Sequence, residues 1–158
     1  MEIDIITQGG AMDHFVWKDS FNIGVAEIDD QHRLFLDYVN DCYNAACRDS
    51  NRAVTDATIY DLKVYAVTHF RFEEGLMKEK GYPGLEEQVQ QHRYFESQVA
   101  ELEKANAEGN NRNIESLMHF LRGWFLKHIL EYDQKLAEFL VSHKVSRSGA
   151  SRRNPGHS

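Results

Sequence analysis

Apolar residues recur at steps of three and four along most of this 158-residue chain. That spacing is typical of helices that bury one face and expose the other. Only Pro83 and Pro155 interrupt the chain as prolines, and runs with the strict alternation of a half-buried strand are scarce. The pattern therefore predicts an all-α protein.

Capping and helix-breaking residues divide the pattern into four segments. Thr55 is a candidate cap for the second segment, and Gly81 with Pro83 would end it. The expected helices cover approximately residues 26–50, 55–81, 85–108 and 113–139. Four long helices with short connections predict an antiparallel up-and-down four-helix bundle.

The two ends of the chain differ from this body. Aromatic residues between 15 and 25 lack helical spacing, which suggests an N-terminal arm laid across the bundle after a loose leader of residues 1–14. Residues 144–158 are small, polar and basic, too poor in apolar side chains to offset the entropy of ordering them. We expect one bundle domain over residues 15–143 and a disordered basic tail over residues 144–158.

Net charge and cysteine content limit the binding partners and the cellular compartment that we expect. The net charge of -7 argues against nucleic acid as a partner, because phosphate binding usually shows as a basic face. No apolar run approaches the roughly 20 residues of a membrane helix, so we expect no membrane partner. Cys42 and Cys47 would lie about 140° apart on a helix, which disfavours a mutual disulfide. These features predict a cytoplasmic protein.

Two pairs of polar residues fall on stretches that should be buried. His69 and Glu73 are four apart, so on a helix they share one face, and a buried carboxylate needs a positive partner. His128 and Asp133 are five apart, which on an α-helix separates them by about 140°. We expect the second pair to flank its buried stripe, and we expect Glu74 to face solvent.

Histidines on the core stripes of all four helices point to a metal. His32, His69, His92 and His128 each occupy such a position, and a core would not gather four imidazoles and two carboxylates for packing. Nitrogen and carboxylate ligands without thiolate suit iron, manganese or zinc, and carboxylates placed to bridge favour two ions. The other histidines, His14, His119, His143 and His157, are expected to be exposed.

Several motifs together carry a family resemblance. They are Trp17-Lys-Asp-Ser-Phe21, Ile28-Asp-Asp-Gln-His32, His69-Phe-Arg-Phe-Glu73-Glu74, Gly81-Tyr-Pro83, His92, and Trp124-Phe-Leu-Lys-His128-Ile with Asp133. In this order and spacing, over roughly residues 15–141, they resemble bacterial hemerythrins. The resemblance implies a four-helix bundle that holds two non-haem iron ions, bridged by carboxylates and an oxo group, and binds O₂ reversibly at one of them.

The same resemblance implies a role for each matching residue. His32 and His69 would be ligands of the iron that binds O₂, Glu73 and Asp133 would bridge the two irons, and His92 and His128 would serve the second iron. The family places a further histidine four residues before His92, where this chain has Gln88. Three interpretations stay open for Gln88: its oxygen ligates iron, it holds a ligating water, or the second iron binds weakly.

Apolar neighbours of these residues complete the expected site. By the resemblance, Phe125 and Ile129 line an oxygen pocket, and Phe35, Leu36 and Phe70 lie within one helical turn of predicted ligands. An O₂-binding protein for storage, delivery or sensing, without enzymatic turnover, is the favoured function. A di-iron oxidase or peroxidase and a sensory module with reduced metal occupancy are the alternatives.

Overall fold

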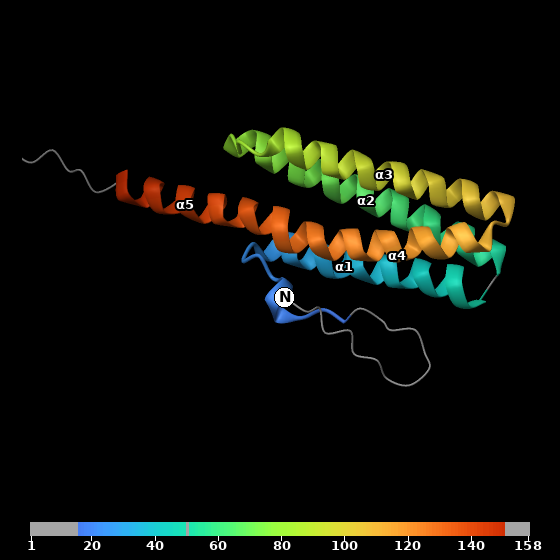
Figure 1. Cartoon of the computed structure of the whole chain (residues 1–158). Helices are drawn as coiled ribbons and strands as arrows, with labels where there is room; N and C mark the ends of the chain where they lie inside the picture. The colour runs from blue at the N-terminus through green and yellow to red at the C-terminus, as the bar shows by residue number, and fades with distance from the viewer. Residues whose placement is uncertain (1–15, 50, 151–158) are drawn as a thin grey trace, which may run out of the picture.

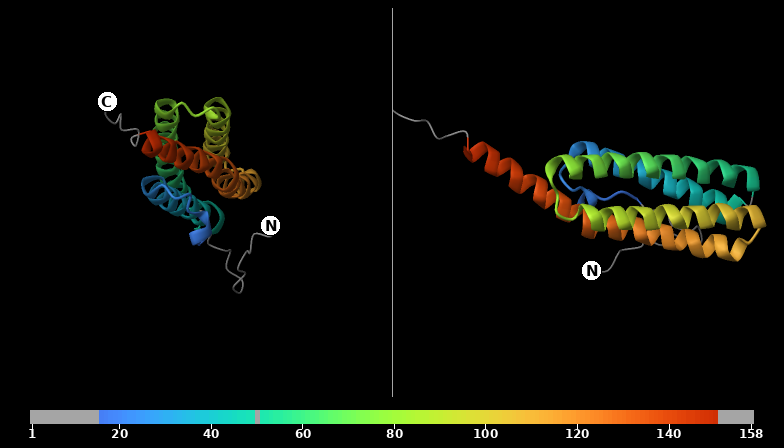
Figure 2. Two further views of the ribbon diagram at one scale, coloured as in Figure 1. Left: turned by 90° about the vertical axis from the view of Figure 1, so that its left-hand side faces the viewer. Right: turned by 90° about the horizontal axis from the view of Figure 1, so that it is seen from above.

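The computed structural model describes residues 16–49 and 51–150, and the side chains of residues 16–48 and 51–143. Its four main helices run up and down beside one another, and the view along the bundle shows them at the corners of a square (Figures 1 and 2). They are α1 (Ala26–Asn44), α2 (Arg52–Lys80), α3 (Leu85–Glu108) and α4 (Asn111–Lys127). The predicted all-α, antiparallel four-helix bundle is confirmed.

Local sequence explains where the helices begin and end. The side chain of Asn51 accepts hydrogen bonds from the N–H groups of Ala53 and Val54 and caps α2. Thr55, expected to be this cap, lies inside the first turn, and its buried hydroxyl donates to the carbonyl of Ala45. Gly81 ends α2 with a φ of 67°, a left-handed conformation that glycine adopts without steric cost.

Two short π-helical segments interrupt the regular helices. The segment η2 (Ala45–Asp49) extends α1, and η3 (His128–Asp133) joins α4 to α5 (Gln134–Ala150) without an intervening loop. At the end of η3 the N–H of Gln134 donates to the carbonyl of Ile129, five residues earlier instead of four. Figure 2 shows α5 projecting beyond the other helices.

The segment before α1 is an arm packed on the bundle. Phe21 and Ile23 are buried, and the side chain of Gln134 donates to the carbonyl of Asn22 at 3.2 Å. Asp29, in the first turn of α1, accepts hydrogen bonds from the N–H groups of Ile23 and Gly24 and fixes the angle at which the arm meets the helix.

The domain boundaries set from the sequence stay predictions. The expected leader, residues 1–14, lies outside the described residues, as does the last part of the expected tail, residues 151–158. Helix α5 continues to Ala150, beyond the boundary at residue 143. Among the helices described, none combines the length and the apolar character that a membrane crossing requires.

Candidate metal centre

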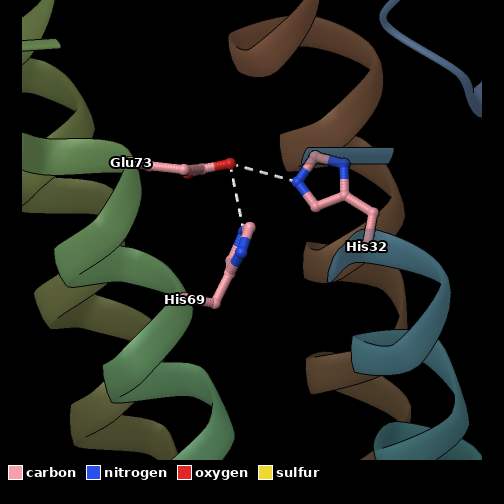
Figure 3. A group of neighbouring side chains, drawn as sticks. All are labelled: His32, His69 and Glu73. Atoms are coloured by element: carbon pink, nitrogen blue, oxygen red, sulfur yellow. Dashed lines mark hydrogen bonds and ion pairs between the residues drawn. The ribbon is translucent and has the colours of Figure 1, made fainter. Parts of the chain in front are cut away.

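Three buried side chains meet between α1 and α2 (Figure 3). The Nε2 atoms of His32 and His69 lie 3.1 Å and 3.0 Å from Oε1 of Glu73. His69 and Glu73 come from successive turns of α2, as the four-residue spacing predicts. One oxygen of Glu73 thus lies within 3.1 Å of imidazole nitrogens from two helices.

The other oxygen of Glu73 faces a second pair of histidines. Nε2 of His92, on α3, lies 3.3 Å from Oε2 of Glu73. His128, the first residue of η3, joins them, and the candidate ligand atoms of Glu73, His92 and His128 all lie within 4.8 Å of one another. Glu73 therefore belongs to two clusters, each of which could hold a metal ion.

The π-helical segment η3 corrects one geometric expectation. Nε2 of His128 lies 3.4 Å from Oδ1 of Asp133, so the two side chains do not flank the stripe about 140° apart, as an α-helix would require. Hydrogen bonds from residue i to i+5 widen the turn, and residues five apart then lie one above the other. The opposite oxygen of Asp133 lies 3.1 Å from Nε2 of His32, so Asp133, like Glu73, contacts histidines of both clusters.

Gln88 lies in the same buried group. Its side chain is 1% exposed, in the first turn of α3, and its Nε2 donates to Oδ1 of Asp133 at 3.2 Å. The structure thus brings together every residue predicted as a ligand. They are His32, His69, Glu73, Gln88, His92, His128 and Asp133.

Outer hydrogen bonds orient two of the imidazoles. Nδ1 of His69 lies 2.8 Å from Oε1 of Gln31, and Nδ1 of His92 lies 2.9 Å from Oε1 of Glu74. With Nδ1 engaged in this way, Nε2 of each ring is left to face the centre.

Glu74 was expected to face solvent, and this expectation was wrong. Its carboxylate accepts hydrogen bonds from both His92 and Arg93, and its side chain is only 14% exposed. The rotation of Glu74 away from Glu73 on α2 turns it toward α3, not toward water. The pattern of one helix could not show this, although the position of Glu74 beside a predicted ligand was a signal.

Neighbouring histidines compensate the buried negative charges of Glu73 and Asp133. Burial alone would raise the pKa of Glu73, but His69, His32 and His92 outweigh it and hold that pKa well below its usual range. Burial and the charge of Glu73 would likewise raise the pKa of Asp133, whereas His128 and His32 lower it to about 2. Without a metal, positive charge on the imidazoles is what keeps both carboxylates ionised.

The pKa values of two of the histidines shift in the opposite direction, upward. Burial would lower the pKa of His32, but its contacts with Asp133 and Glu73 raise it to about 9. The pKa of His92 is also raised, because contacts with Glu73 and Glu74 outweigh burial. A divalent cation could replace these protons, since metal binding requires neutral imidazole and ionised carboxylate.

Buried polar atoms without hydrogen-bond partners test whether the residues fit such cations. Within the described chain they include atoms from six of the grouped residues, and several of them lie at ion-pair distance from one another without hydrogen-bond geometry. Besides Nδ1 of His32 and Nδ1 of His128, these atoms are Oε2 of Glu73, Oε1 of Gln88, Nε2 of His92, Nε2 of His128 and Oδ2 of Asp133. Buried polar groups are rarely left unpaired, and donor atoms that converge on common points satisfy a metal ion instead of each other. The residues present fit a pair of cations.

Aromatic rings pack against the ligand histidines. The ring of Phe70 stacks on His92 with centroids 4.0 Å apart, and the ring of Phe35 lies 5.6 Å from that of His69. Phe125 meets His32 edge-on at 6.4 Å. Leu36 and Ile129, the other two residues predicted for the oxygen pocket, are buried as well. All five predicted pocket residues are core residues; whether they line an oxygen pocket stays a prediction.

The two other histidines that the structure describes lie apart from the centre. His119 is about half exposed, with 54% of its side chain accessible, and His143 is exposed as expected. His14 and His157 lie outside the described residues.

Comparison with known proteins agrees with this centre. Residues 23–140 match the family described as Hemerythrin HHE cation binding domain. The chain belongs to the hemerythrin family. It is 34% identical over 128 residues to a bacteriohemerythrin of Stenotrophomonas maltophilia, with 81% of this chain and 82% of the relative covered. The predicted family resemblance is confirmed.

Other hemerythrins are similar in sequence and in fold. A bacteriohemerythrin of Pseudomonas aeruginosa is 30% identical, covering 85% of this chain and 86% of the relative, and the myohemerythrin of Riftia pachyptila is 28% identical over 77% and 89%. A crystal structure of wild-type hemerythrin superposes with a TM-score of 0.70 at 27% identity, covering 80% of this chain and 97% of that one.

Proposed function

We propose that this chain holds two non-haem iron ions and binds O₂ reversibly, without turning over a substrate. The observation that carries the proposal is the position of Glu73, whose two oxygens face two separate histidine pairs. A carboxylate shared in this way is the arrangement that two neighbouring cations require. Membership of the hemerythrin family supports iron as the metal.

The ligand roles follow from the two clusters. His32 and His69 would hold the iron that captures O₂, and His92 and His128 would hold the other. Glu73 and Asp133 would bridge both ions, since each carboxylate contacts histidines of both clusters. When bound, the iron pair would supply the electrons for reversible O₂ capture.

The surrounding side chains control what reaches the centre. Phe35, Phe70 and Phe125 are 2% exposed or less and pack against ligand rings. A dry apolar wall disfavours water and protons, which compete for the metal and promote oxidation of the iron. Gln31 and Glu74 hold His69 and His92 in place so that little rearrangement accompanies binding. These features favour a carrier, store or sensor of O₂ over an oxidase.

The proposal also places the protein in the cytoplasm. Cys42 and Cys47 are both free thiols in the structure, and such thiols persist in a reducing compartment.

Anaerobic reconstitution with ferrous iron tests the function. We expect two irons per chain, new visible absorption when O₂ is admitted, and loss of that absorption when O₂ is removed, over repeated cycles. Continuous consumption of O₂ in the presence of a reductant would contradict the carrier proposal and favour an oxidase. A reconstituted protein without iron would contradict the iron centre itself.

A further inference from the structure

Gln88 is a neutral polar side chain in the most buried part of the centre. It is 1% exposed and comes from the same face of α3 as His92, one turn earlier. Burying an amide without partners costs free energy, so both ends of this side chain need an explanation.

One end of the amide is accounted for by Asp133. The two groups lie 3.2 Å apart, and an ionised carboxylate only accepts hydrogen bonds. The NH₂ end of Gln88 must therefore face Asp133, which fixes the opposite direction for the amide oxygen.

That oxygen is the unexplained end. Oε1 of Gln88 is buried and, within the described part of the chain, has no hydrogen-bond partner. Nε2 of His92 and Nε2 of His128 are also buried and have no hydrogen-bond partner there. An amide oxygen is an acceptor that can coordinate a cation but cannot pair with the NH₂ it belongs to.

We propose that Gln88 acts at both ends: its amide oxygen is a ligand of the cation held by His92 and His128, and its NH₂ group positions Asp133. This inference rests on the proposed two-metal centre and adds a ligand to one half of it. An amide oxygen is a weaker donor than imidazole, so it strengthens the hold on this ion, here called the second ion, less than a third histidine would.

Three substitutions separate the two ends of the amide. Gln88→Glu keeps an oxygen at the same position but removes the donor to Asp133, Gln88→Leu removes both, and Gln88→His offers an imidazole. Gln90→Glu, on an exposed position of the same helix, is the matched control for added charge. The probe is ferrous ion alone, titrated anaerobically into the metal-free proteins, with the melting temperature and helical circular dichroism recorded for each.

We expect wild type to bind two ions. In Gln88→Leu the affinity for the second ion should fall by at least about tenfold while the other ion is retained, and Gln88→His should raise the affinity for the second ion by a similar factor. Gln88→Glu should keep the second ion, because the ligating oxygen remains. Gln90→Glu should match wild type.

Each contrary result is decisive. Two ions bound by Gln88→Leu with wild-type affinities would overturn the ligand role, and so would loss of the second ion from Gln88→Glu, which would leave donation to Asp133 as the only role. If Gln88→Leu does not fold, the Gln88→Glu result alone decides. A wild-type protein that takes up no iron would overturn the proposed function together with this inference, whereas two ions with unaffected Gln88 variants would overturn this inference alone.

Discussion

The centre uses two helical pairs that reach the same result by different backbones. His69 and Glu73 are four residues apart on the regular helix α2 and lie 3.0 Å apart. His128 and Asp133 are five residues apart and lie 3.4 Å apart, because the π-helical segment η3 widens the turn between them. In both, one histidine and one carboxylate stack on a shared face.

The difference shows that the sequence spacing of two ligands predicts the relative direction of their side chains only when the number of residues per helical turn is known. A five-residue gap on an α-helix would direct one of the two side chains away from the centre. The additional residue in η3 is absorbed within the helical segment, and α5 follows directly, angled away from the line of α4 (Figure 2). We infer that η3 exists to present Asp133 beside His128.

Deleting one residue between the two members of each pair should have the largest effect on the centre. Removing exposed Arg71 turns Glu73 by about 100° relative to His69, and we expect loss of both ions and a lower melting temperature. Removing exposed Glu131 from η3 leaves a four-residue spacing that an α-helix accommodates, so this variant should keep both ions. Metal analysis and circular dichroism of the two variants test this. Equal loss of metal in both would contradict our interpretation of η3.

Neutralising Glu73 or Asp133, the two carboxylates proposed to bridge the ions, should separate the two pairs. Glu73 contacts histidines of both clusters through both oxygens, so Glu73→Gln should weaken both ions by more than the roughly 100-fold typical of losing an outer-shell partner. Asp133→Asn leaves His32, His69 and Glu73 in place, and one ion should remain. Iron titrations of both variants measure this. A larger loss of iron affinity in Asp133→Asn than in Glu73→Gln would contradict this prediction, because Asp133 would then be the more important of the two carboxylates.

Glu74 offers a smaller perturbation confined to one cluster. Glu74→Ala removes the acceptor of His92 Nδ1 and should weaken the ion at His92 and His128 by about 10-fold to 100-fold. Glu96 pairs with the neighbouring Arg71 and Arg93 but contacts no ligand in the ion pairs described, so Glu96→Ala is the matched control. An equal effect of both variants on metal affinity would indicate that Glu74 acts only through surface charge.

The smallest expected effect is on the pH dependence of the metal-free protein. The pKa of His32 is raised to about 9, so its contribution to stability is complete below its unfolded value of 6.5 and is lost as the pH rises through about 9. The pKa of Asp133 is lowered to about 2, so its contribution is complete above 3.8 and is lost as the pH falls through about 2. The melting temperature should therefore fall by several degrees between pH 6.5 and 9.

Metal provides the control for this pH prediction. In the iron-loaded protein the imidazole of His32 is neutral, so no proton is lost from it over the same range. The loaded protein should have a nearly constant melting temperature from pH 6.5 to 9. A metal-free protein with an equally constant profile would contradict the role of protonated His32.

Much of the fold and of the centre follows from helical periodicity. The stripe positions of His32, His69, His92 and His128 predicted four inward imidazoles on four helices, and all four are buried. The four-residue spacing also predicted how His69 and Glu73 meet. These features depend on one helix at a time, which is the information that a sequence pattern contains.

Features that depend on neighbouring helices or on backbone irregularity were not predictable. The relation between His128 and Asp133 depends on η3, for which residues 128–133 carry no proline or glycine signal. The environment of Glu74 depends on where α3 lies, and the direction of the Gln88 amide depends on Asp133 across the bundle. In each case the missing information is a tertiary contact.

Anomalous diffraction at the iron absorption edge, from crystals of the anaerobically reconstituted protein, tests the central claim most directly. We predict two iron peaks, one in contact with His32, His69 and Glu73 and the other with Glu73, His92 and His128. A single peak, or two peaks that do not share Glu73, would contradict the two-metal centre.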